Sequence, residues 1–189
     1  MKGCYCLIIN LDDSSKIKIG KLGRVDFKKG YYIYVGSAMN YLESRLKRHL
    51  SSKKKLHWHI DYLLKKATVN DIIFNESERK IECDLSQYIS SKTYGIEGFG
   101  CSDCNCKSHL YYLKNRNEAI ECVKDAYDSI AMDYDFFKIW IPVFSYAYNL
   151  SRMNLRQYPL KPLLPVRQAI VFNLLYTTFP VVVYVSAVT

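Results

Sequence analysis

The sequence predicts one mixed α/β domain followed by an apolar C-terminal extension. The chain has 189 residues, 49% hydrophobic and 24% charged, so it is long and apolar enough to bury a core. Strand-like and helix-like segments alternate over residues 1–128. Residues 1–128 hold 22 Lys/Arg and 16 Asp/Glu, whereas residues 129–189 hold 5 and 2. We therefore place the domain at 1–128 and the extension at 129–189.

Two segments near the N-terminus have the composition of buried strands. Residues 3–10 (GCYCLIIN) and 30–38 (GYYIYVGSA) are runs of aromatic and β-branched residues. Helical spacing follows at once, because leucines recur at i, i+4 and i+8 from Leu42. We therefore expect a helix over 40–50, with Asn40 as its N-cap.

The same patterns predict the rest of the domain. Helices are expected over 56–66, 80–90 and 117–127, and short strands over 69–75 and 109–113. A loop rich in Gly and Cys spans residues 95–107.

Composition narrows the class of protein and of partner. The balance of apolar and charged residues excludes a disordered or collagen-like chain. The net charge is +9 and the chain contains 17 Tyr, which suits a polyanionic partner such as nucleic acid. Seven Cys, an odd number, and an N-terminus without a secretory signal predict a cytoplasmic protein with reduced thiols.

Two short motifs lie on the two predicted N-terminal strands. Gly3-Cys4-Tyr5 and Tyr34-Val35-Gly36 stand about thirty residues apart. Together they resemble the two half-motifs of the GIY-YIG nuclease superfamily. That superfamily places an Arg about nine residues beyond the second motif, where this chain has Arg45. His49 lies one helical turn further on, where relatives often have Tyr.

A longer set of motifs resembles one uncharacterised GIY-YIG branch, found alone or joined to endonuclease-III-type DNA glycosylases. The motifs occur in order over roughly residues 1–125: GKLG (20–23), YVGSA (34–38), RH (48–49), HWHIDYL (57–63), EC (82–83) and GFGCSDCNCKSHL (98–110). The resemblance implies a small, mainly antiparallel central sheet flanked by helices. It also implies a metal-dependent DNA endonuclease that acts in repair or processing, with DNA and a glycosylase or other repair protein as partners.

The resemblance also suggests roles for single residues. Tyr5 is the candidate general base, with Tyr34 and His49 as further members of the site. Arg45 has the planar fork that binds phosphate oxygens, and Glu82 is the candidate ligand for Mg²⁺ or Mn²⁺. Ordinary structural roles stay open: sheet aromatics for the tyrosines, a solvated helix residue for Arg45, and a helix N-terminal carboxylate for Glu82. Two rival carboxylates lie nearby, Glu76 and Glu78.

Two histidines and an aspartate form a second group. His57, His59 and Asp61 would contact phosphate or relay protons beside the site. The alternative is a helix start with a His–Asp pair and a core Trp58, because His57 and Asp61 share one face of a helix.

Cysteines and a histidine suggest a third group. Cys101, Cys104, Cys106 and His109 could hold Zn²⁺, although their spacing is tighter than in usual zinc modules. Cys83 could replace one ligand, and Cys101 is the most dispensable. We favour a structural or site-lining role for this loop over zinc.

A basic run follows the predicted catalytic arginine. Residues 45–55 (RLKRHLSSKKK) contain six Lys/Arg and no acidic residue. We expect this run to contact the DNA backbone, whereas the alternative is a solvated charged face. The residues expected to bind nucleic acid are Lys47, Arg48, Lys53, Lys54, Lys55, His57 and His59.

The last 22 residues, 168–189, carry no charge and are long enough to cross a bilayer. A C-terminal membrane anchor, an apolar packing segment and a non-native tail stay open as interpretations. Two rival functions also stay open. One is a non-catalytic nucleic-acid-binding module, and the other is a zinc-stabilised interaction domain with a membrane tail.

Overall fold

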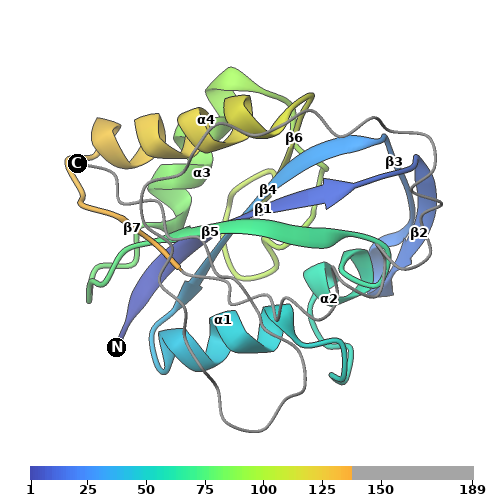
Figure 1. The fold of residues 1–189 in the computed structure, drawn as a ribbon, viewed down its shortest axis with the longest axis horizontal. Helices are drawn as coiled ribbons and strands as arrows, with labels where there is room; N and C mark the ends of the chain where they lie inside the picture. The colour runs from blue at the N-terminus through green and yellow to red at the C-terminus, as the bar shows by residue number, and fades with distance from the viewer. Residues whose placement is uncertain (138–189) are drawn as a thin grey trace, which may run out of the picture. The chain divides into compact units, whose positions relative to one another are not determined.

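The computed structural model describes residues 1–137, which form the mixed α/β fold shown in Figure 1. The elements in chain order are β1 (Gly3–Leu11), β2 (Ser15–Ile19), a 3₁₀ turn (Gly20–Leu22), β3 (Gly23–Phe27), β4 (Gly30–Ala38), α1 (Leu42–Leu50), α2 (His59–Leu63), β5 (Thr68–Phe74), α3 (Glu82–Lys92), β6 (Leu110–Leu113), α4 (Arg116–Ser129) and β7 (Asp135–Phe136).

Five strands form one sheet in the order β6-β4-β1-β5-β7, and each neighbouring pair is antiparallel. The expected antiparallel sheet flanked by helices is therefore confirmed. The central strand β1 pairs with β4 along its whole length, from Gly3 opposite Ala38 to Leu11 opposite Gly30. The strands β2 and β3 form a separate two-stranded hairpin.

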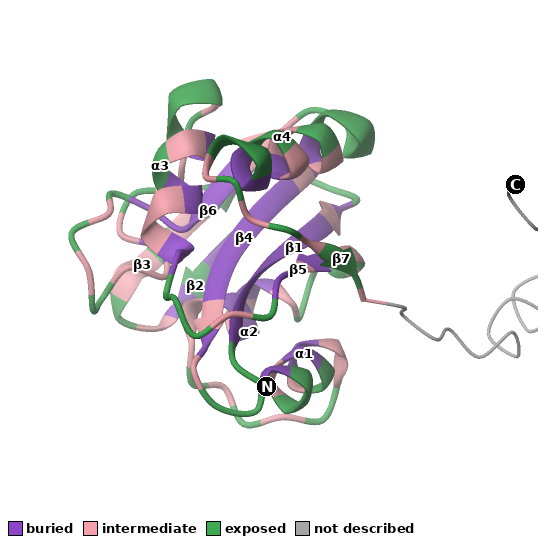
Figure 2. Cartoon of the chain, turned by 90° about the vertical axis from the view of Figure 1, so that its left-hand side faces the viewer, coloured by how far each residue is buried: buried purple, intermediate pink, exposed green. Residues whose placement is uncertain are grey.

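The sheet separates two hydrophobic cores. On one face Tyr5, Leu7 and Ile9 of β1 pack with α1, α2 and the β2–β3 hairpin. On the other face the alternate residues of β1, Cys4 among them, pack with α3 and α4. Figure 2 shows β1 and β4 buried along most of their length, and α3 and α4 exposed on their outer sides. Burial on both faces explains why β1 is a continuous apolar run rather than an alternating one.

One edge of β4 becomes free partway along its length. Strand β6 pairs with β4 only from Tyr31 to Tyr34, and one further hydrogen bond runs from the Val35 amide to the His109 carbonyl. Beyond that bond, no strand of the described chain pairs with β4 on this side. The segment from Val35 to Ala38 therefore leaves an opening beside the sheet.

Most predicted elements are present, with some corrected bounds. The strand over 30–38 has the predicted limits, whereas the helix over 56–66 shrinks to His59–Leu63. Asn40 is not the N-cap of α1, because the helix starts from Tyr41, whose φ of 55° is left-handed and whose side chain makes no capping hydrogen bond. The hairpin β2–β3 and the short strand β7 were not predicted.

The folded unit continues past the predicted boundary at residue 128. That residue lies inside α4, and β7 then adds a strand beside β5. Phe137 packs against Phe74, with ring centroids 6.2 Å apart. The boundary was placed too early because the drop in charge does not coincide with the end of the sheet. The proposed membrane segment, 168–189, lies outside the described residues, and within 1–137 no helix is long and apolar enough to span a membrane.

Candidate active site

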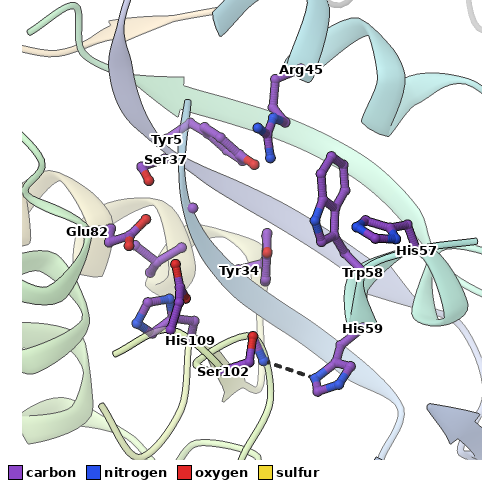
Figure 3. A pocket seen from close by; sticks show the side chains of 14 residues that line it. Tyr5, Tyr34, Ser37, Arg45, His57, Trp58, His59, Glu82, Ser102 and His109 are labelled. Atoms are coloured by element: carbon purple, nitrogen blue, oxygen red, sulfur yellow. Dashed lines mark hydrogen bonds between the residues drawn. The ribbon is translucent and has the colours of Figure 1, made fainter. Parts of the chain in front are cut away.

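A pocket of about 440 Å³ opens at the free edge of β4 (Figure 3). Its lining includes Tyr5, Tyr34, Arg45 and Glu82. These are four of the five residues for which the sequence predicts a catalytic role. The fold therefore brings these four residues together in one pocket.

The four residues reach the pocket from both faces of the sheet. Arg45 comes from α1, which covers one face, and Glu82 lies in the first turn of α3, which covers the other. Both side chains line the same pocket because, on the side of β4 away from β1, no strand within residues 1–137 pairs with Val35–Ser37 to separate them. The site thus exists because β6 begins only at Leu110, opposite Tyr34.

The glycines of both sequence motifs are required by close contacts. Gly36 lies opposite Tyr5 in the β1–β4 ladder, and a Cβ added to it would lie 2.7 Å from the Tyr5 ring. At Gly3 an added Cβ would clash with the backbone carbonyl of Asn75. The glycine of the second motif therefore makes room for the tyrosine of the first.

The Tyr5 hydroxyl is hydrogen-bonded to His49. The distance from Oη to Nε2 is 2.8 Å, and His49 is only 3% exposed. Burial, reinforced by the nearby Lys54 charge, lowers the pKa of His49 to about 3. The imidazole is therefore neutral at physiological pH, and within residues 1–137 its Nδ1 has no hydrogen-bond partner. His49 does not line the pocket but supports Tyr5 from behind.

Both tyrosines of the site are protonated at neutral pH. Burial raises the pKa of Tyr5 and of Tyr34 well above the ordinary value, while Arg45 lowers both. Tyr34 packs edge-on against Phe99, and its ring centroid lies 6.5 Å from that of Tyr5. Each hydroxyl can donate or accept a hydrogen bond, and loss of its proton would require additional positive charge in the pocket.

Trp58 positions the arginine. The Arg45 guanidinium lies 4.4 Å from the centroid of the Trp58 ring, and the Arg48 guanidinium lies 4.1 Å from it. Trp58 also lines the pocket itself. The sequence predicted only a core role for this residue, because nothing in the spacing shows that its ring faces an arginine.

Glu82 belongs to a small charged network. It is 5% exposed and pairs with Lys80 at 2.8 Å, and Lys80 lies 3.7 Å from the exposed carboxylate of Asp103. The bond to Glu82 raises the pKa of Lys80. The Lys80 ammonium therefore lies between two carboxylates of the pocket wall, those of Glu82 and Asp103. Lys80 was not among the predicted site residues.

Two residues of the predicted DNA-binding set have internal partners instead. Arg48 makes a two-pronged ion pair with the fully buried Asp61, both distances being 2.9 Å. The Lys54 ammonium donates to the backbone carbonyls of Arg48 and His49 at the end of α1. Contact of Arg48 and Lys54 with phosphate therefore stays a prediction, and their internal partners were not foreseen because a charge run cannot reveal a buried carboxylate nearby.

Asp61 stabilises the start of α2, which is the structural alternative that the sequence left open. Its carboxylate accepts hydrogen bonds from the backbone amides of His57 and Trp58. Burial alone would raise its pKa, but the hydrogen bonds from Arg48 and these amides lower it overall. The carboxylate therefore fixes the start of α2 and is not free for phosphate or proton transfer.

The other predicted DNA-binding residues are accessible. Lys47, Lys53, Lys55 and His57 are exposed, although Lys47 pairs with Glu43 at 2.6 Å. His59 lines the pocket with His57, and its Nδ1 accepts a hydrogen bond from the Gly100 amide at 3.2 Å. Burial lowers the pKa of His59.

A second groove of about 910 Å³ adjoins the pocket and shares His57, His59 and Ser102 with it. Four lysines of its lining are exposed and, within the described chain, form no ion pair: Lys18, Lys21, Lys65 and Lys66. The sequence pattern did not indicate that these lysines belong to the site. The alternation in SKIKI could have indicated the hairpin that carries Lys18, but five residues form only a short pattern.

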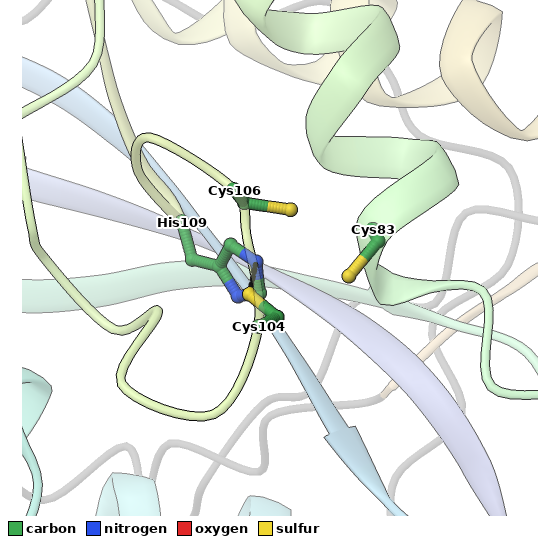
Figure 4. A group of neighbouring side chains, drawn as sticks. All are labelled: Cys83, Cys104, Cys106 and His109. Atoms are coloured by element: carbon green, nitrogen blue, oxygen red, sulfur yellow. Dashed lines mark hydrogen bonds between the residues drawn. The ribbon is translucent and has the colours of Figure 1, made fainter.

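Three cysteines and a histidine form a cluster next to the pocket (Figure 4). One ligand atom from each of Cys83, Cys104, Cys106 and His109 lies within 4.8 Å of all the others. Cys83 comes from α3, and Cys101 is outside the cluster. The group could hold a metal ion. Cys83 takes the place of Cys101 in it, which is the alternative that the sequence left open.

Comparison with known proteins gives one family match. The model of the family described as Domain of unknown function DUF123 matches residues 4–132. No curated protein and no solved structure matches the chain.

Proposed function

The chain belongs to the DUF123 family, and we propose that this member is an endonuclease that hydrolyses DNA phosphodiester bonds. The observation that carries the proposal is the meeting of Tyr5, Tyr34, Arg45 and Glu82 in one open pocket. The resemblance of their motifs to those of GIY-YIG nucleases supports the same activity. Such an enzyme would act in DNA repair or processing.

The residues supply the groups that phosphodiester hydrolysis needs. Arg45 would bind two phosphoryl oxygens and neutralise their charge. Tyr5 would orient the attacking water through its hydroxyl, which His49 holds in place at 2.8 Å. Tyr34 would donate a hydrogen bond to the phosphate from the same side of the sheet.

The oxygen donors of the pocket fit a divalent cation. Glu82 and Asp103 already share the Lys80 ammonium, and Lys80 is 44% exposed, so it can leave the carboxylates. Carboxylate and phosphate oxygens are ligands that Mg²⁺ and Mn²⁺ prefer. Glu82 would hold the ion, with Asp103 beside it. When bound, the ion would supply charge neutralisation and a more acidic water.

The basic groove gives a path for the DNA backbone into the pocket. Its exposed lysines lie on the hairpin and after α2, and the groove reaches the pocket through His57 and His59. Lys53 and Lys55, which precede His57 in the chain, are also exposed. Contacts of this kind bind phosphate without reading sequence.

The activity is tested by incubating the full chain with supercoiled plasmid and branched DNA, with Mg²⁺, with Mn²⁺ or with a chelator. We expect cleavage that depends on the metal and falls by about a hundredfold or more in Glu82→Gln and Tyr5→Phe. Glu78→Gln is the matched control, because its carboxylate is 87% exposed and pairs only with Lys2 in the described chain. Undiminished cleavage by folded Glu82→Gln would refute the assignment.

The groove is tested by DNA binding at several salt concentrations. We expect Lys65→Ala combined with Lys66→Ala to make the slope of log affinity against log salt shallower by about 0.9 for each lost phosphate contact. Lys92→Ala combined with Lys124→Ala, on the other layer of the fold, is the control. An equal effect of both pairs would refute a specific path, and binding without cleavage in either metal would refute the enzyme.

A further inference from the structure

The cysteine–histidine cluster joins two segments that are distant in the chain. Cys83 lies in the first turn of α3, whereas the other three residues lie in the loop that precedes β6. His109 is anchored on both sides, because its amide donates to the Phe99 carbonyl and its carbonyl accepts from Val35. The cluster therefore connects this loop to the helix beside it (Figure 4).

The spacing of the four side chains suits tetrahedral coordination. In a zinc site with Zn–S bonds of 2.3 Å, neighbouring ligand atoms are about 3.7 Å apart. The ligand atoms here lie within 4.8 Å of one another, and Cys104 Sγ is already 3.4 Å from His109 Nε2. Small side-chain adjustments would close the tetrahedron.

The ligand types select the metal. Three thiols and one imidazole form a soft donor set that favours zinc, whereas Mg²⁺ prefers oxygen ligands. All four cluster positions are free to act as ligands, since none of the seven cysteines of the chain forms a disulfide. Four protein ligands leave no open coordination position, which is typical of structural rather than catalytic zinc.

We propose that Cys83, Cys104, Cys106 and His109 bind one structural Zn²⁺ that fixes the loop before β6 to the start of α3. Each segment carries a residue of the pocket wall beside a ligand: Glu82 precedes Cys83, and Asp103 precedes Cys104. His109 lines the pocket itself. The zinc would thus hold one wall of the candidate active site, and it is a separate site from the divalent ion proposed at Glu82.

The test measures the metal content of the purified full chain by mass spectrometry, with no DNA present. We expect about one zinc per chain in the wild type and loss of zinc in Cys83→Ser and in Cys106→Ser. Cys101→Ser is the matched control, because Cys101 lies in the same loop outside the cluster, and it should retain zinc. Zinc-free wild-type chain, or equal zinc content in all variants, would overturn the proposal.

A second measurement tests the site even if the cysteine variants fail to fold, because it uses the wild-type chain. Wild-type chain loaded with Co²⁺ should show a thiolate-to-cobalt charge-transfer band in the near ultraviolet and the visible bands of tetrahedral cobalt, and Cys101→Ser should show the same bands. Absence of both bands in folded wild-type chain would overturn the site. Because neither readout uses cleavage, failure of the nuclease proposal leaves this result unaffected.

Discussion

His49 should limit the stability of the protein in mild acid. It is neutral and buried in the folded chain, where its pKa falls from the ordinary value of 6.5 to about 3. Above pH 6.5 the folded and unfolded chains both hold a neutral imidazole. Below that pH the unfolded chain binds a proton at this residue and the folded chain does not, so the free energy of unfolding must fall as the pH falls.

The size of the effect follows from the two pKa values. Between them, one proton contributes about 1.4 kcal/mol per pH unit. From pH 6.5 to pH 5 the folded state should therefore lose about 2 kcal/mol at His49 alone. The effect should keep growing until the pH approaches the folded pKa, near 3.

Urea unfolding of wild type and His49→Gln between pH 7.5 and pH 5 would measure this contribution. The variant cannot titrate at this position, so its stability should fall less steeply with pH than that of the wild type. The comparison is needed because burial also lowers the pKa of His59 and of His109, which add to the wild-type slope. His57→Gln, at an exposed position, is the control. Equal slopes for wild type and His49→Gln would refute the reasoning.

Two further substitutions test contacts that support the site. Gly36→Ala would bring a methyl group to 2.7 Å from the Tyr5 ring, and overpacking of this kind costs about 1–3 kcal/mol. Thermal unfolding would measure the loss against Ser37→Ala, and an unchanged melting temperature would contradict the contact. Asp61→Asn should cost about 3 kcal/mol in urea unfolding, at the lower end for a buried ion pair because the Arg48 side chain is 27% exposed. A variant as stable as the wild type would show that this pair adds nothing to stability.

The fold could be predicted where local pattern and burial agree. Strand β4 has its predicted limits because its aromatic and β-branched run is buried along most of its length. Strand β2 was missed because its exposed lysines alternate with only two buried isoleucines, a pattern too short to separate from a polar loop. Helix α2 is shorter than its pattern because Asp61 holds the preceding amides in an extended start.

The site could be predicted where the motif itself positions the residue. Tyr5 and Gly36 lie opposite each other in one ladder, so their meeting follows once the two motifs are placed on paired strands. The partners of Arg48 and the place of Cys83 depend on how α2 and α3 pack, and no spacing along the chain contains that information. The same limit applies to Trp58, whose contact with Arg45 exists only in the folded chain.

The opening before the start of β6 makes the candidate site depend on two separately packed layers. Arg45 is held by the core beneath α1, whereas Glu82 is held by the core beneath α3 and α4. Proteins open locally in cooperative units, often at a lower free energy than that of global unfolding. If either layer opens as such a unit, the side chain that it carries, Arg45 or Glu82, moves out of the pocket while the other layer stays folded. The temperature at which the site fails would then be set by the weaker layer rather than by the melting temperature of the whole domain.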